Sequence, residues 1–103
     1  GKFMSNIYFN HYRKGVVCLD YDIIYESATL GSKVTGCDRT SIVKCCTKDR
    51  KSCFNHKGIK LHWMYLKDYV EKYGLEHTLT LKYFDNNDYL EDYYNAKSKV
   101  QGY

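Results

Sequence analysis

Cationic and hydroxyl side chains follow one another closely in the middle of this chain, at Arg39, Thr40, Ser41 and Lys44. Side chains of these types hydrogen-bond to base edges when a helix carries them into the major groove of DNA. Further cations that could hold phosphates come next, at Lys48, Arg50, Lys51, Lys57 and Lys60. The pattern predicts contact with duplex DNA. The alternative is a solvated basic face that binds nothing.

Cysteine and histidine form a second set of chemically active residues. Cys53 and His56 have the C-x-x-H spacing of zinc ligands, and Cys45, Cys46 and His62 lie nearby in the sequence. A second C-x-x-C pair is missing, so buried free thiols are the simpler interpretation. A Cys–His pair could also act as nucleophile and base, but no Gly-rich phosphate loop or nucleophile elbow accompanies it. We therefore expect no metal, no cofactor and no enzymatic activity.

Two short helices are predicted to position the basic residues. Ser27 is a suitable N-cap for the first helix, and Gly36 ends it because glycine adopts the left-handed conformation without a Cβ clash. Asp38 is the predicted N-cap of a second helix that runs from Arg39 to about Lys48. The apolar seam of this helix consists of Ile42, Cys45 and Cys46. A glycine turn between two such helices is typical of a helix-turn-helix.

Strands are predicted on both sides of the helix pair. Residues 16–20 and 23–26 are rich in β-branched residues and predict a hairpin whose inner face packs on the first helix. Residues 59–66 predict a strand that closes on the core, with Trp63 as an anchor. Gly31, inside the first helix, either lets another element approach closely or is a simple imperfection.

The remaining segments complete an α+β fold. Residues 1–15 predict an edge strand or arm, and residues 49–58 a polar, basic loop. We expect a helix over 68–73 that ends at Gly74, a strand over 75–84 and a helix over 89–100. The fold class is therefore a β-hairpin followed by a helix-turn-helix, a closing strand and a C-terminal strand and helix segment.

Residues 16–67 resemble a nuclease-associated modular (NUMOD-type) DNA-binding repeat, as found in phage and intron homing endonucleases and in small phage proteins. The residues that carry the resemblance are Ser27, Gly31-Ser32, Thr35-Gly36-Cys37, Arg39-Thr40-Ser41-Ile42, Lys44-Cys45-Cys46, Arg50-Lys51 and Trp63-Met64-Tyr65. The chain departs from the pattern at Leu30, where an acidic residue is common, and at Gly31, where alanine is common. The resemblance implies a helix-turn-helix-like reader of DNA, of phage or mobile-element origin. Neither a His-Asn-His cluster nor a GIY-YIG pair accompanies it.

Charge is distributed unevenly along the 103 residues. Residues 31–67 contain nine Lys or Arg and two acids, whereas residues 68–95 contain seven acids and two Lys. The basic middle predicts a polyanionic partner.

The acidic, Tyr-rich end suggests an alternative function. A phage-encoded inhibitor, similar to small anti-CRISPR proteins, could place carboxylates where a host nucleic-acid-binding protein such as a CRISPR effector holds phosphates. The residues that would make this contact are Asp85, Asp88, Glu91, Asp92 and Tyr93. A solvated acidic helix is the simpler interpretation.

The length and composition predict one domain over residues 1–103, with a helix-turn-helix core at 16–67 and an acidic extension at 68–103. No apolar run approaches the length of a membrane span, and the N-terminus lacks the apolar core of a signal peptide. Five cysteines without an even framework favour free thiols in a reducing compartment. We therefore expect a cytoplasmic protein, in the host cell if it is phage-encoded; the oligomeric state is left open.

Overall fold

The computed structural model describes residues 14–84 of the chain. The predicted N-terminal arm, the predicted helix over 89–100 and the acidic residues of the proposed inhibitor surface lie outside these residues.

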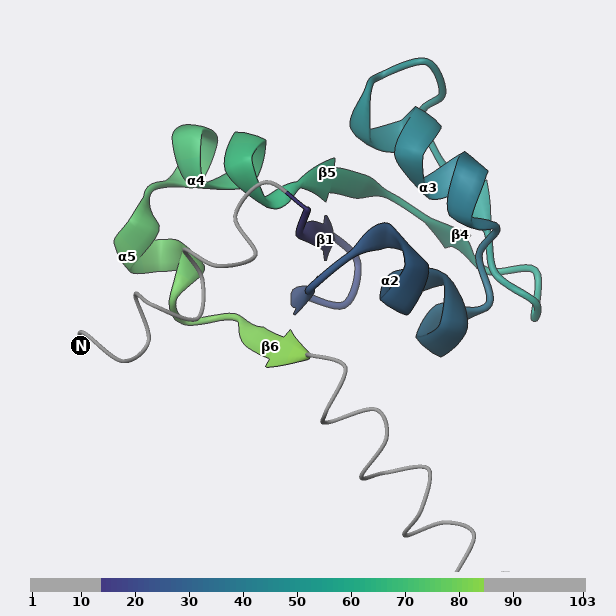
Figure 1. Cartoon of the computed structure of the whole chain (residues 1–103), viewed down its shortest axis with the longest axis horizontal. Coiled ribbons are helices and arrows are strands. Elements are labelled where there is room, and N and C mark those ends of the chain that lie inside the picture. Colours follow the sequence, from purple (N-terminus) through teal and green to yellow (C-terminus); the bar gives the residue numbers. More distant parts are fainter. Residues whose placement is uncertain (1–13, 85–103) are drawn as a thin grey trace, which may run out of the picture.

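A mixed four-stranded sheet lies at the centre, with the strand order β5-β1-β2-β6 (Figure 1). β1 (Val16–Cys18) pairs antiparallel with both β2 (Ile23–Tyr25) and β5 (Trp63–Tyr65), while β6 (Lys82–Phe84) pairs parallel with β2. β1 and β2 carry continuous apolar runs instead of alternating ones, because both faces of the sheet are covered.

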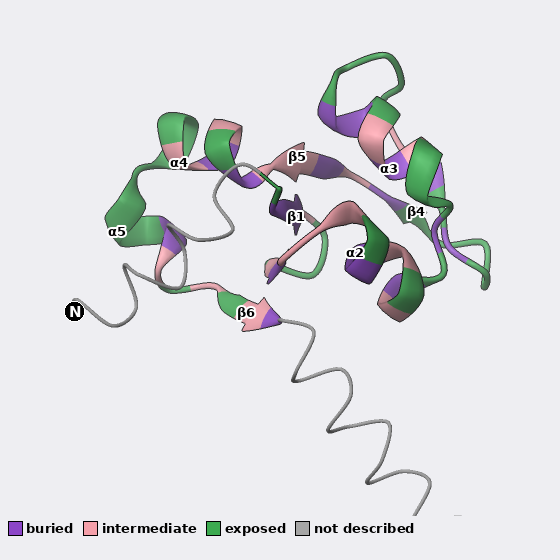
Figure 2. Ribbon diagram, viewed as in Figure 1, coloured by how far each residue is buried: buried purple, intermediate pink, exposed green. Residues whose placement is uncertain are grey.

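The two faces of the sheet pack against different helices. Val16, Cys18 and Tyr25 belong to the larger core cluster, with α2 (Ala28–Thr35) and α3 (Arg39–Cys46). Val17 and Ile24 point to the opposite face because successive strand residues alternate. There they meet α4 (Leu66–Tyr73), followed by the short α5 (Leu75–Thr78). Figure 2 shows the buried residues gathered along β1, β5 and the inner sides of α2 and α3.

The predicted caps of α2 and α3 are confirmed. The Ser27 hydroxyl accepts a hydrogen bond from the Leu30 amide at 3.1 Å. Gly36 ends α2 in the left-handed conformation, with φ of 86°. The Asp38 carboxylate accepts a hydrogen bond from the Ser41 amide at 3.1 Å and begins α3. α3 ends at Cys46, two residues before the predicted Lys48, because Lys48 has a positive φ of 70°.

Trp63 is 3% exposed, which confirms its predicted role as a core anchor. Gly31 of α2 faces its indole ring: a Cβ at this position would lie 3.1 Å from Cζ3 and 3.2 Å from Cη2 of Trp63. The glycine therefore lets α2 approach the sheet closely, which is the first of the two predicted explanations.

Two of the predicted strands are wrong in part. Residues 75–84 form α5 and then β6, not one strand, because Leu75 and Leu79 stand four residues apart, a spacing that also suits a helix. The predicted strand over 59–66 is divided at His62, whose amide donates to the Asp20 carboxylate at 2.6 Å.

The predicted basic loop contains a strand. β3 (Cys53–Phe54) pairs antiparallel with β4 (Lys60–Leu61) and forms a separate small hairpin beside the helix pair (Figure 1). The Asn55 side chain stabilises its turn, because its Oδ1 accepts hydrogen bonds from the amides of Lys57 and Ile59 at 2.8 and 2.9 Å.

Candidate nucleic-acid interface

α3 places its apolar residues in the core and its polar residues in solvent. Ile42, Cys45 and Cys46 are buried in the larger core cluster, as predicted. Thr40 and Lys44 are exposed and lie four residues apart, so they share the outer face of the helix. Arg39 and Thr47 are exposed at the two ends.

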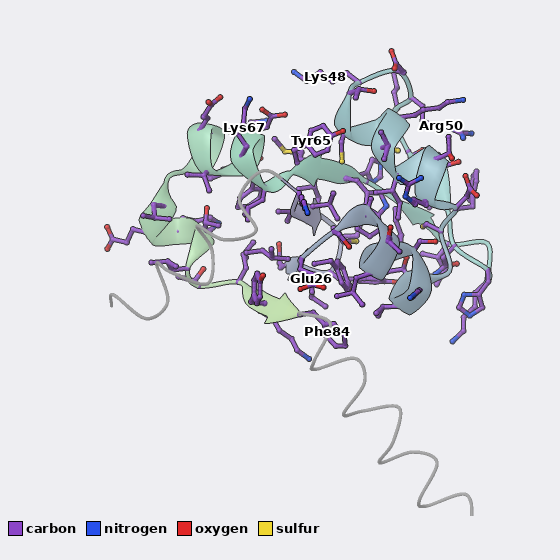
Figure 3. All side chains as sticks on the ribbon, in the orientation of Figure 1. Glu26, Lys48, Arg50, Tyr65, Lys67 and Phe84 are labelled. Atoms are coloured by element: carbon purple, nitrogen blue, oxygen red, sulfur yellow. The ribbon has the colours of Figure 1, made fainter. Side chains whose placement is uncertain are left out.

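The segment that follows α3 folds back along the helix. Lys48 takes a left-handed φ of 70°, and the amides of Asp49 and Arg50 both donate to the Lys44 carbonyl, at 2.9 and 3.2 Å. Nη1 of Arg50 then donates to the Ser41 hydroxyl at 2.9 Å. In Figure 3, Lys48 and Arg50 lie at the α3 end of the molecule, whereas Lys67 lies on α4. The structure thus brings the segment's cations next to the first turn of α3.

The β3–β4 hairpin holds the two remaining predicted cations, Lys57 and Lys60. Its turn rests on the link between α2 and α3, where His56 Nδ1 lies 3.2 Å from the Thr35 carbonyl oxygen. Lys57 is exposed in this turn, close to the link.

Lys60 has a different orientation. Cys53 and Leu61, paired across the hairpin, are buried in the cluster that contains α3. Phe54 and Lys60, the next pair, are exposed on the opposite face because side chains alternate along a strand. Lys60 therefore points away from the side of the hairpin that packs against α3.

The cations of this region have no acidic partners within residues 14–84. None of Arg39, Lys44, Lys48, Arg50, Lys51, Lys57 and Lys60 forms an ion pair there. Asp49 accepts a hydrogen bond from the Thr47 hydroxyl at 2.8 Å, and Asp38 is held at the helix N-terminus as its cap. Since the Asp38 carboxylate already occupies that positive end, an anion would be met by side chains and not by the helix dipole.

The residues considered as zinc ligands are not assembled. In the described part of the chain, no group of three or more His, Cys, Asp or Glu residues could hold a metal ion. His56 contacts the Thr35 carbonyl, and His62 contacts the Asp20 carboxylate at 3.1 Å. All five cysteines are buried and free. Desolvation raises the pKa of the Cys46 thiol to about 12.

A surface cleft of about 320 Å³ adjoins the hairpin turn. Its lining residues are Tyr21, Ile23, Tyr25, Val34, Thr35, Asn55, His56, Lys57 and Ile59. The sequence analysis did not predict this cleft, because its walls come from the β1–β2 turn, the end of α2 and the β3–β4 hairpin, and no local pattern joins them. Only the exposed Tyr21, between Asp20 and Asp22 in a turn, is an unusual residue for its position.

The search for membrane spans in residues 14–84 finds no helix long and apolar enough to cross a bilayer. No family model, curated protein or solved structure matches this chain. The resemblance to NUMOD-type repeats thus depends on the sequence pattern alone and stays a prediction.

Proposed function

We propose that this protein binds duplex DNA, without catalysis, through the outer face of α3 and the segment that follows it. The observation that supports this proposal is the set of exposed cations on and after α3, which no carboxylate within residues 14–84 neutralises. A surface of this kind attracts phosphates and releases counterions when they bind.

The side chains divide between two roles in this proposal. Arg39, Thr40 and Lys44 extend from the exposed side of α3 and reach base edges. Ser41, which was predicted among the base contacts, instead holds the guanidinium of Arg50 through the hydrogen bond between their side chains.

Phosphate contacts come from the remaining cations near α3, which are Lys48, Arg50, Lys51 and Lys57. We do not expect Lys60 to reach the same duplex, since it lies on the hairpin face opposite the one that packs against α3.

The test compares duplex affinity for the wild type and for Arg39→Ala combined with Lys44→Ala. Both changes remove an exposed cation and keep a good helix former, so α3 should still fold. Affinity should fall steeply between about 50 and 200 mM salt, and the double variant should lower the slope of log affinity against log salt by about two. Fluorescence anisotropy with a labelled duplex measures both quantities.

Lys67→Ala combined with Lys72→Ala is the matched control. These lysines are also exposed, but they lie on α4, on the other face of the sheet (Figure 3). This variant should bind duplex DNA like the wild type. Absence of binding by the wild type at low salt, or an equal loss in the control, would contradict the proposal.

The inhibitor function remains an alternative proposal. Its contact residues lie outside residues 14–84, so nothing in the described structure favours it. A pull-down of a host nuclease by the wild type that Asp88→Lys combined with Asp92→Lys abolishes would support it. Both functions place the protein in a reducing cytoplasm, where its buried thiols stay unpaired.

A further inference from the structure

The cleft beside the hairpin combines an apolar interior with a cationic edge. Ile23 and Val34 are half-buried in its lining, while Tyr21 and Ile59 are 42% and 46% exposed. Two large apolar side chains thus remain open to solvent on opposite walls, one from the β1–β2 turn and one from β4's approach. An exposed aromatic ring facing an aliphatic side chain is a suitable place for a flat ring to stack.

Tyr25 adds an unsatisfied polar group to this lining. The residue is only 1% exposed, and its ring packs between Trp63 and Phe84 with centroids 5.8 Å from each. Its hydroxyl has no hydrogen-bond partner among residues 14–84. A buried hydroxyl without a partner in the wall of a cleft can donate to or accept from a ligand.

The charges of the cleft favour an anionic ligand. Lys57 and His56 lie at its edge, and no acidic residue is part of its lining. The polar groups of Asn55 and Thr35 are already used inside the protein, since Asn55 stabilises the hairpin turn and the Thr35 hydroxyl donates to the Gly31 carbonyl at 2.7 Å. The groups left for a ligand are therefore two aromatic residues, an aliphatic wall and a cation.

We propose that this cleft binds one unpaired nucleotide of a DNA strand, with the base between Tyr21 and Ile59 and the phosphate near Lys57. The proposal rests on the proposed DNA binding and adds a preference for DNA with an unpaired base. The volume of about 320 Å³ is at the lower end of ligand sites and suits a single nucleotide. Val34 and Thr35 of the lining stand just before the turn that leads into α3, so a duplex on α3 passes close to the cleft.

The experiment compares a short duplex with the same duplex carrying one extra, unpaired 2-aminopurine nucleotide. The wild type should bind the bulged duplex about tenfold more tightly, which is within the range measured for stacking of one base on an aromatic side chain. The 2-aminopurine fluorescence should change when the base stacks on Tyr21. Tyr21→Ala and Ile59→Ala should each remove most of this preference and leave the affinity for the intact duplex unchanged.

Tyr73→Ala is the matched control, because Tyr73 is 45% exposed on α4, away from the cleft. It should keep the preference for the bulged duplex. Equal affinity for both duplexes, while Arg39→Ala with Lys44→Ala still weakens binding, would overturn the cleft proposal and leave the proposed function intact. Loss of all DNA binding would overturn both. Equal competition by free deoxyadenosine monophosphate at a similar concentration would also overturn it, in favour of a free nucleotide.

Discussion

Arg50 is the residue that joins the segment after α3 to the helix itself. Its backbone amide donates to the Lys44 carbonyl at 3.2 Å, and its guanidinium donates to the Ser41 hydroxyl at 2.9 Å. A guanidinium has further donors that this one bond leaves available. Arg50 can therefore be held by the protein and still bind a phosphate.

This arrangement predicts different effects for its two partners. Arg50→Ala removes a charge and should lower the slope of log affinity against log salt by about one. Ser41→Ala removes only the hydroxyl that orients the guanidinium, so it should weaken duplex binding a little without changing the slope. Anisotropy titrations at several salt concentrations measure both. An unchanged slope for Arg50→Ala would show that Arg50 makes no phosphate contact.

At the scale of elements, the close contact between α2 and the sheet depends on Gly31. A Cβ there would meet the Trp63 ring at 3.1 and 3.2 Å, and Trp63 is 3% exposed in the core. A ring packed on all sides cannot easily move away. The helix propensity of alanine and the overpacking of the ring therefore act in opposite directions.

Gly31→Ala should lower the free energy of unfolding by about 1 kcal/mol, since overpacking costs about 1–3 kcal/mol and helix propensity returns about 1. Lys33→Ala, an exposed change in the same helix, is the control and should stay within about 0.5 kcal/mol of the wild type. Urea denaturation followed by tryptophan fluorescence measures these differences. A more stable Gly31→Ala would mean that the ring shifts without cost.

The elements that the sequence predicted well are those whose signals are local. Ser27, Gly36 and Asp38 act on amides within four residues, so their caps were readable. The parallel pairing of β6 with β2 was not, because the partners lie far apart in the chain. The candidate site followed the same division: the exposed face of α3 was predicted, whereas the Ser41–Arg50 contact and the cleft required the fold.

At the scale of the whole molecule, the sheet separates a basic side from a balanced one. The α3 side carries the seven cations of the predicted DNA site, with Asp38 and Asp49 as its nearby acids in sequence. On the other face, Lys67 and Lys72 of α4 are offset by Asp68 and Glu71 of the same helix. An uneven charge distribution of this kind orients a protein as it approaches a polyanion.

The sheet's larger core cluster contains all five thiols, and their burial makes the stability of the domain sensitive to high pH. Desolvation raises the pKa of Cys18 to about 11 and that of Cys46 to about 12, from 9.0. A thiol whose pKa is higher in the folded than in the unfolded protein keeps its full contribution below the unfolded pKa. As the pH rises above about 9, the unfolded state loses its proton first and becomes favoured.

The free energy of unfolding should therefore decrease from about pH 9 upward, by up to about 1.4 kcal/mol per pH unit for each such thiol. Urea denaturation at a series of pH values measures the slope. Cys46→Ala deletes one of these thiols, so its slope between pH 9 and about 12 should be smaller than that of the wild type by up to one proton. Equal slopes would show that the Cys46 thiol ionises as readily in the folded protein as in the unfolded chain.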